Sequence, residues 1–428
     1  MKFLGINVNV QNSPELDPGF IPLHLFNKAF LADAKKPVSI AVERAKGEMA
    51  CFHTFIHGTP EMKEADCFYI DRLVKFILWM KGGFRIYVSG DEMIYDYLRS
   101  IYCAGGKQEF DWDYMANVFE HPFEILLVDK VPENHDAPQK VGGHFEGCRV
   151  GFDAGGSDRK VSAVIDGETV YSEEVVWFPK INSDPDYHYN GIVEALKSAA
   201  SHMPRVDAVG VSSAGVFINN RTMNASLFLK VPKELYDAKV KDIYTRAITD
   251  TFGDVPFCVF NDGDVTALAG AISLEDTNIL GIAMGTSEAG GYVDENGYIT
   301  GWLNELAFIP VDANPEAMQD EWSLDIGCGA GGYSLALAPF VTEAVGVDIS
   351  GGMIEIARAR GKELGIANAA FSVLNWSEAD IDALGFRNRF QVVFAHMTPA
   401  VCDYATLEKM DACAARLCML QKPTRVSR

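Results

Sequence analysis

The sequence lacks a long apolar run. No stretch of about 18 uncharged apolar residues occurs among the 428 residues, which argues against a membrane-spanning helix. Polar residues follow the first seven positions, where a signal peptide would continue with an apolar stretch. We therefore expect a soluble, cytoplasmic protein that has no membrane partner.

Closely spaced cysteine pairs are also missing. The nine cysteines are an odd number, and none of them forms a Cys-x-x-Cys motif. This pattern indicates neither a disulfide framework nor a zinc site. We expect reduced thiols and no bound zinc.

Basic residues are scarce relative to acidic ones. The chain has 37 Lys and Arg against 59 Asp and Glu, a formal net charge of -22. Such a charge repels phosphate backbones, so nucleic acid is not an expected partner. The apolar share of 48% is typical of a globular protein, and the length predicts about two to four folded units.

The charge changes along the chain near residue 323. Residues 324–428 carry 10 of the 37 basic and 11 of the 59 acidic residues, so most of the negative charge precedes them. We predict an α/β region of unknown role over 1–145, a second unit over 146–323 and a third over 324–428. In the first region, apolar periodicity predicts a helix over 70–80.

A glycine-rich turn is predicted near the start of the second region. Strand-like runs over 149–153 and 161–165 are joined by a turn that contains Gly155, Gly156 and Ser157. The backbone of such small residues can approach a phosphate closely. Asp153 ends the first strand, where a carboxylate can hold a Mg²⁺ ion that bridges phosphates. A tight hairpin without a ligand is the alternative.

A second glycine-rich turn, predicted over 285–291, follows an apolar strand. Its candidate phosphate-binding residues are Gly285, Thr286, Gly290 and Gly291. Two such turns can hold one nucleotide between them. Between the turns, Asp262 precedes a helix expected over 265–272, and it is the candidate base that accepts a hydroxyl proton during phosphoryl transfer. A helix N-cap is its alternative role.

The order of these features resembles the ROK family of sugar kinases and sugar-responsive proteins, part of the actin-like ATPase group. The resemblance covers residues 149–312, in which Asn261-Asp262 matches the family's Asn-Asp pair and Asn304-Glu305 resembles the stretch whose Glu contacts sugar. It implies an α/β fold with actin-like, ribonuclease H-like ATPase lobes. It also implies ATP with Mg²⁺, a sugar or related small-molecule substrate, and catalytic roles for Asp262 and Glu305.

Two positions depart from the ROK pattern. Phe308 stands where the family usually carries a His shared by sugar and zinc. Cys328 stands alone, although the family has a zinc-binding cysteine cluster. The resemblance therefore implies neither a bound zinc ion nor a particular sugar.

The third region opens with another glycine-rich turn. Asp325 is followed by Gly327, Gly329 and Gly331, and Asp348 ends the next predicted strand 23 residues after Asp325. A carboxylate at that distance can accept hydrogen bonds from both hydroxyls of a ribose. Strands are predicted over 324–326, 344–348, 370–374, 390–394 and 417–420. Dinucleotide binding is one interpretation of the pattern.

The pattern Asp-x-Gly-x-Gly-x-Gly over 325–331 also resembles class I S-adenosylmethionine-dependent methyltransferases. The resemblance implies a truncated Rossmann-like sheet that binds S-adenosylmethionine through these residues and Asp348. Asn375 lies where the family often has an Asp facing adenine, and residues 396–399 would border the substrate. His396 is a candidate base, with a plain loop residue as the alternative.

Both modules are shorter than the families that they resemble. Each resemblance stops before the family's usual end, which predicts an uncovered sheet edge and favours a homo-oligomer. We predict a two-module transferase that joins a sugar kinase-like unit to a methyltransferase unit. Two alternatives stay open: a catalytically impaired sugar or nucleotide sensor, and a join of two incomplete gene fragments.

Overall fold

The computed structural model describes residues 1–12, 19–284, 288–313 and 322–421. The chain divides into two compact units, one of Phe30–Pro310 and the other of Met1–Ala29 with Val311–Arg428. Within the described residues, no helix is long and apolar enough to cross a membrane.

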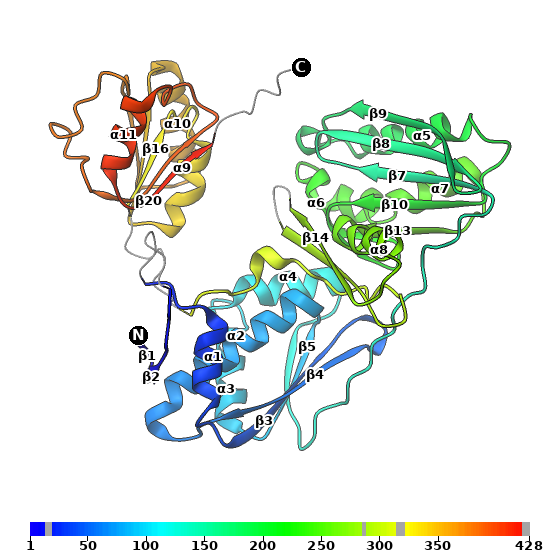
Figure 1. The fold of residues 1–428 in the computed structure, drawn as a ribbon, viewed down its shortest axis with the longest axis horizontal. Helices are drawn as coiled ribbons and strands as arrows, with labels where there is room; N and C mark the ends of the chain where they lie inside the picture. The colour runs from blue at the N-terminus through cyan, green and yellow to red at the C-terminus, as the bar shows by residue number, and fades with distance from the viewer. Residues whose placement is uncertain (13–18, 285–287, 314–321, 422–428) are drawn as a thin grey trace. The chain divides into compact units, whose positions relative to one another are not determined.

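The unit Phe30–Pro310 begins with a mixed sheet of strand order β4-β3-β5-β6 (Figure 1). Its elements are β3 (Lys36–Glu43), β4 (Met49–Ile56), α2 (Lys63–Lys81), β5 (Arg85–Ser89), α3 (Glu92–Ile101), α4 (Glu109–Phe119) and β6 (Glu124–Leu127). Helix α2 contains the helix predicted over 70–80. Its residues Ile70, Val74 and Ile77 are fully buried because their spacing puts them on one face of the helix.

A second sheet of the same unit has the strand order β13-β10-β7-β8-β9. Strands β7, β8 and β9 are antiparallel, whereas β10 and β13 run parallel to β7. The elements are β7 (Cys148–Ala154), β8 (Asp158–Ile165), β9 (Glu168–Val176), α5 (Pro185–Ala200), β10 (Ala208–Ser213), β11 (Val216–Ile218), β12 (Arg221–Asn224), α6 (Lys233–Leu235), α7 (Ile243–Phe252) and β13 (Phe257–Asn261). Alternate residues of β7, including Val150 and Phe152, enter a core that also contains Trp177, Leu196 and Tyr244.

Helix α8 (Asp262–Leu274) follows β13 and packs on the hairpin of β14 (Ile279–Met284) and β15 (Glu288–Val293). The backbones approach closely because a Cβ at Gly281 would lie 2.2 Å from the backbone N of Ala267. A Cβ at Gly291 would lie 2.3 Å from the Cα of Asp264. The predicted extent of the second turn, 285–291, is therefore wrong: residues 288–291 belong to β15, and glycine is required there by the packing of α8.

We expect Gly281→Ala to lower the free energy of unfolding by about 1 to 3 kcal/mol, because the added methyl group overlaps the α8 backbone. Urea denaturation followed by circular dichroism measures this change. Gly210→Ala in β10 is the matched control, since a Cβ there would meet nothing within 4 Å. Equal stability of the two variants would contradict the close packing.

The unit of Met1–Ala29 and Val311–Arg428 contains a five-stranded parallel sheet of order β18-β17-β16-β19-β20. Its elements are β1 (Lys2–Phe3), β2 (Ile6–Asn7), α1 (Leu23–Leu31, which runs past the unit boundary), β16 (Trp322–Ile326), α9 (Gly332–Leu337), β17 (Glu343–Asp348), α10 (Gly351–Glu363), β18 (Ala369–Val373), β19 (Phe390–His396), α11 (Tyr404–Cys413) and β20 (Ala414–Gln421). Helices α9, α10 and α11 pack on the sheet (Figure 1). This alternation of strands and helices is the one that the sequence predicts.

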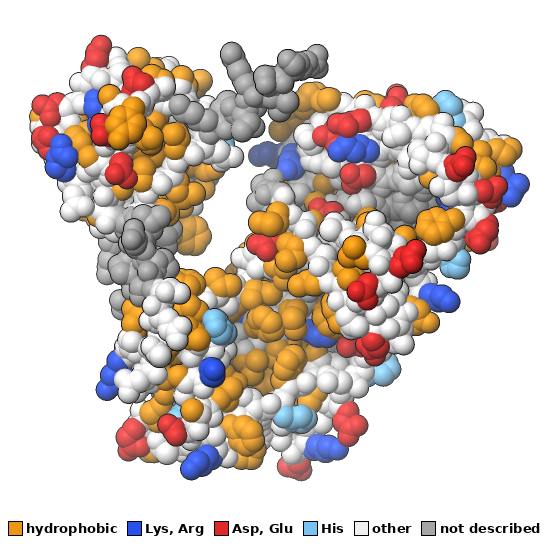
Figure 2. Space-filling model, viewed as in Figure 1, with side chains coloured by type: hydrophobic (Ala, Val, Ile, Leu, Met, Phe, Trp, Pro, Cys, Tyr) orange, Lys and Arg blue, Asp and Glu red, His pale blue; other side chains and the backbone are white. Residues whose placement is uncertain are grey.

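The surface mixes charges of both signs with exposed apolar side chains. Figure 2 shows acidic and basic side chains interspersed over the visible face. In β14, the alternate residues Leu280, Ile282 and Met284 are exposed, whereas Gly281 between them is buried against α8. The hairpin thus presents one apolar face to α8 and another to solvent.

Candidate functional site

Glycines build the turn that follows β16 in the parallel sheet. Gly327, Gly329 and Gly331 have φ angles of 73°, 53° and 74°, a left-handed region that favours glycine. A Cβ at Gly329 would meet no atom within 4 Å, so this residue borders open space. A Cβ at Gly331 would lie 2.8 Å from the ring of Phe371, so packing also requires that glycine.

A cavity of about 290 Å³ lies at the carboxyl edge of this sheet. It is lined by Gly327, Val347, Asp348, Ile349, Leu374, Asn375, Trp376, Ser377, Thr398, Pro399, Ala400 and Cys402. Three predicted cofactor residues, Gly327, Asp348 and Asn375, are thus brought to one cavity from three different strand ends. Asp325, Gly329 and Gly331 are not among the residues that line it.

Asp348 links the tip of β17 to the glycine-rich turn. Its Oδ2 accepts a hydrogen bond from the backbone N–H of Gly329 at 2.9 Å, and its Oδ1 accepts one from Ser350 N–H at 2.8 Å. A carboxylate has about four acceptor positions, so each oxygen keeps capacity for another donor. The carboxylate is therefore held in place at the cavity and still able to bind a ligand hydroxyl.

Asp325 lies under the turn, within the protein. Its side chain is 2% exposed and accepts a hydrogen bond from the Ser334 hydroxyl at 2.8 Å. Burial raises the pKa of Asp325 to about 6. The carboxylate thus connects the end of β16 to helix α9, and its contact with a ligand stays a prediction.

Residues that sequence reasoning missed also line the cavity. Trp376 directly follows the predicted Asn375, and its indole N–H donates to the Thr406 carbonyl at 3.1 Å. Thr398 lies so close that a Cβ at Gly327 would come within 2.0 Å of its hydroxyl oxygen. The sequence predicts that 396–399 border the substrate; Thr398 and Pro399 line the cavity, whereas His396 does not.

In the unit Phe30–Pro310, three predicted carboxylates interact electrostatically. Burial raises the pKa of Asp262, and the charge of Asp153 raises it further. Burial, followed by the charge of Asp262, raises the pKa of Glu305 to about 7. Among the described residues, no group of three or more His, Cys, Asp or Glu side chains could hold a metal ion, so the metal role of Asp153 stays a prediction.

The first predicted phosphate turn joins β7 and β8. Gly155, Gly156 and Ser157 form it, and the Ser157 hydroxyl donates to Asp158 at 2.9 Å. A Cβ at Gly156 would lie 2.7 Å from Nζ of Lys180, so an ammonium group that the sequence did not suggest lies beside the turn.

The second predicted phosphate turn is described only in part. Gly285 and Thr286 lie outside the described residues. Gly290 and Gly291 lie in β15 and pack closely: a Cβ at Gly290 would lie 3.0 Å from Leu306, and Gly291 lies against α8. Their predicted contact with a nucleotide stays untested.

An aromatic stack adjoins Glu305. Phe308 stacks on Trp79 with ring centroids 4.1 Å apart and on Phe110 at 5.8 Å. The backbone N–H of Glu305 donates to the carbonyl of Trp79 at 3.1 Å. The position where the ROK pattern has a His thus belongs to a stack with residues of the first predicted region.

Comparison with known proteins identifies the parallel-sheet unit. Residues 324–421 match the family model described as "Methyltransferase domain". The chain is 46% identical over 48 residues to the uncharacterized methyltransferase YcgJ of Bacillus subtilis, covering 11% of this chain and 19% of that protein. It is 31% identical over 106 residues to the 23S rRNA (uracil(1939)-C(5))-methyltransferase RlmD of Xanthomonas euvesicatoria, covering 21% of this chain and 24% of that protein.

A solved structure of the Bacillus YcgJ protein is 29% identical, covers 19% of this chain and 33% of that one, and has a TM-score of 0.18. The chain spans about a fifth to a quarter of the length of these curated relatives. The family model matches residues outside 149–312, so the ROK resemblance of those residues stays a prediction. Residues 324–421 of the chain form a methyltransferase domain.

Proposed function

We propose that the chain transfers a methyl group from S-adenosylmethionine to a small molecule, with the cofactor in the 290 Å³ cavity. The observation that carries this proposal is the meeting of Gly327, Asp348 and Asn375 on that cavity. The match of residues 324–421 to the methyltransferase family model supports it.

The residues at the cavity fit this cofactor. The remaining acceptor positions of Asp348 suit the two ribose hydroxyls. Asn375 offers an amide to the adenine edge, and Trp376 offers an aromatic surface beside it. When bound, S-adenosylmethionine supplies an electrophilic methyl group on a sulfonium.

The chain's own residues would hold the acceptor in line with that methyl group, which is the main requirement of a displacement reaction. Thr398, Pro399 and Cys402 line the same cavity after β19 and are placed to border the acceptor. Asp325 acts at a distance, because its hydrogen bond to Ser334 fixes the turn against α9. It is therefore proposed as a positioning residue.

Isothermal titration of the full chain with S-adenosylmethionine and S-adenosylhomocysteine tests the proposal. We expect both to bind with one site per chain, because both carry the adenosine that Asp348 and Asn375 would recognise. The absence of heat at near-millimolar cofactor would rule the site out. It would favour the alternative that the chain joins incomplete fragments.

As a second function, we propose that residues 149–312 bind the phosphates of Mg·ATP as a ROK-like unit. The strand order of the second sheet, with three antiparallel strands followed by two parallel ones, supports this proposal. So does the electrostatic interaction of Asp153, Asp262 and Glu305. Mg²⁺ is commonly held by one or two carboxylates with phosphate oxygens and water, so Asp153 alone suffices as a protein ligand.

In this second function, Asp262 would accept the proton of a sugar hydroxyl, and its raised pKa moves it toward the neutral range that suits a base. We expect Mg·ATP to raise the melting temperature of the chain and Gly156→Val to abolish that rise, because a side chain there displaces Lys180 from the turn. Sugar-dependent release of ADP would show turnover. Binding without ADP release would favour the sensor, and no shift with Mg·ATP would refute the second function.

A further inference from the structure

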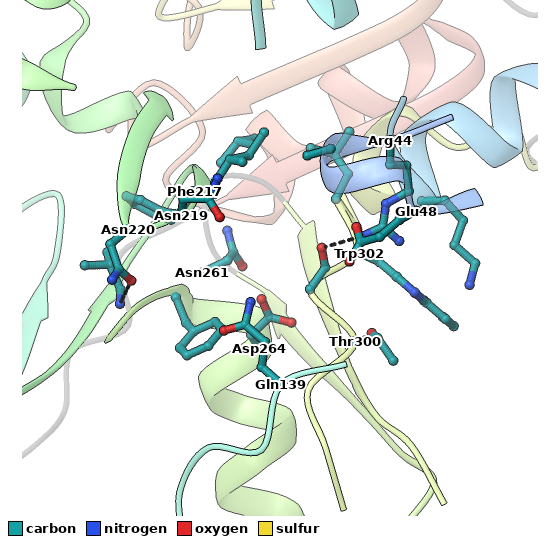
Figure 3. Close-up of a pocket in the computed structure, with 18 of the residues that line it drawn as sticks. Arg44, Glu48, Gln139, Phe217, Asn219, Asn220, Asn261, Asp264, Thr300 and Trp302 are labelled. Atoms are coloured by element: carbon teal, nitrogen blue, oxygen red, sulfur yellow. Dashed lines mark hydrogen bonds and ion pairs between the residues drawn. The ribbon is translucent and has the colours of Figure 1, made fainter. Parts of the chain in front are cut away.

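A second cavity, of about 330 Å³, lies inside the unit Phe30–Pro310 (Figure 3). Its walls come from the connection between β3 and β4, the end of α2, the turn between β11 and β12, the start of α8 and residues 300–303. Asp262, Asp153 and Glu305 are not among its lining residues. Asn261, the first residue of the predicted Asn-Asp pair, does line it. The cavity therefore adjoins the predicted phosphate-transfer carboxylates but does not include them.

The cavity contains a buried carboxylate, one oxygen of which has no hydrogen-bond partner among the described residues. Asp264 is 5% exposed, and its Oδ1 has no hydrogen-bond partner among the described residues. Residues two apart on a helix project about 200° apart, so Asp264 and Asp262 face different sides of α8. A buried carboxyl group without a partner is costly, and a ligand that donates to it would remove the cost.

The other charges around the cavity compensate one another. Arg44, 4% exposed, pairs with Glu48 at 2.8 Å and with Asp136 at 3.3 Å. Lys81 lies 3.5 Å from Asp136. Two cations thus balance two carboxylates. Four charged residues line the cavity: Arg44, Glu48, Lys81 and Asp264. Within the described residues Asp264 is the one of them that forms no ion pair, and the charge of Arg44 acts on it only over a longer distance.

We propose that this cavity binds a small organic monocation, a primary amine whose ammonium group pairs with Asp264. The Asp264 carboxylate would repel an anionic ligand, and a neutral ligand would bring no positive charge to pair with Asp264. The side chains of Phe217 and Phe260 form an apolar part of the cavity wall. The side-chain amides of Asn219 and Gln139 can donate hydrogen bonds to polar groups of the ligand and accept hydrogen bonds from them. The volume of about 330 Å³ admits a molecule about the size of a monosaccharide.

The ring of Trp302 is already occupied by an internal cation. Nζ of Lys81 lies 3.0 Å from the Trp302 ring centroid, the position that a bound ammonium would take in an aromatic cage. This pair leaves Asp264 as the recognition point for the ligand ammonium. It also closes one side of the cavity with residues from α2 and from residues 300–303.

Three acyclic polyols of matched size test the proposal by isothermal titration with the full chain at pH 8: glucamine (an amine), sorbitol (neutral) and gluconate (an anion). We expect glucamine to bind at least tenfold more tightly than sorbitol, and gluconate to give no heat. Equal binding of glucamine and sorbitol, or no glucamine binding below about 10 mM, a floor of roughly 3 kcal/mol of binding free energy, would overturn the proposal.

Variants with opposite expected effects separate recognition from damage to the fold. Asp264→Asn, which keeps the shape and removes the charge, should abolish the preference for glucamine over sorbitol. Gln139→Glu should raise the glucamine affinity severalfold, because it adds a negative charge to the wall. Asp254→Asn, an exposed carboxylate, is the control that should change neither. A preference retained in Asp264→Asn would refute the site, whereas S-adenosylmethionine binding reports independently on the proposed methyltransferase.

Discussion

Asp348→Ala is expected to lower the affinity of the chain for S-adenosylmethionine at least 100-fold. In the proposed complex the carboxylate accepts hydrogen bonds from both ribose hydroxyls, and hydrogen bonds to a charged group contribute about 1.5 to 3 kcal/mol each. The substitution also removes the hydrogen bonds from Gly329 N–H and Ser350 N–H that hold the turn beside β17. Both losses lower the affinity for S-adenosylmethionine.

Isothermal titration of the wild type and of two variants measures this effect. Asp411→Ala is the matched control, because Asp411 is an exposed carboxylate on α11 in the same domain. Asp348→Asn should fall between wild type and Asp348→Ala, since it keeps one oxygen acceptor and loses the charge. Wild-type affinity in Asp348→Ala would mean that the cofactor does not lie where Asp348 is, even if the chain binds it.

The parallel sheet could be predicted from the sequence because its signals are local. The strands predicted over 324–326 and 344–348 lie within β16 (Trp322–Ile326) and β17 (Glu343–Asp348). An apolar run followed by a glycine-rich turn and a helix specifies a strand tip without reference to distant residues. The carboxyl ends of parallel strands meet at one edge, which is why Gly327, Asp348 and Asn375 line one cavity.

The middle of the chain shows where such reasoning fails. Gly290 and Gly291 have the composition of a turn, but they lie in a strand because α8 needs a surface without side chains. That requirement comes from tertiary packing and leaves no local pattern in the sequence. The turn of Gly155 and Gly156 was predicted correctly, since the two flanking strands are adjacent in the sequence.

The cavity that contains Asp264 could not be predicted from the sequence. Arg44 donates to the carbonyl of Gly301 across 257 positions of sequence, and Lys81 lies over Trp302. Neither Arg44 nor Lys81 belongs to a recognisable motif. Composition suggested only a solvated acidic protein, whereas the fold buries Asp264 and leaves it without an ion pair among the described residues.

Asp264→Asn is expected to stabilise the protein at pH 8 relative to the wild type, by an amount that disappears near pH 4. Burial, followed by the charge of Asp262 and opposed by that of Arg44, raises the pKa of Asp264 to about 7 from 3.8. The folded state therefore binds a proton that the unfolded state releases between about pH 4 and pH 7. The stability of the wild type falls as pH rises through that window and stays lower above it.

The size of the expected stability difference follows from the shift in the pKa of Asp264. About three pKa units at about 1.4 kcal/mol each give a wild-type loss of roughly 4 kcal/mol by pH 8, and the neutral amide introduced by Asp264→Asn cannot undergo it. At pH 4, Asp264 is protonated in the folded state, so wild type and variant should differ little. Glu305 and Asp325 are also buried with raised pKa values, but they are present in both proteins and cancel in the comparison.

Urea denaturation at pH 4.5, 6 and 8 measures the difference between the variant and the wild type, with Asp254→Asn as the control that should follow the wild type at every pH. A difference of about 2 to 4 kcal/mol in favour of Asp264→Asn at pH 8, shrinking toward pH 4.5, is the expected result. Adding glucamine at pH 8 should reduce this difference, because an ammonium paired with the carboxylate stabilises the wild type alone. A constant difference across pH would show that Asp264 is ionised throughout and already compensated within the protein, and the cavity would then have no unpaired charge to offer an amine.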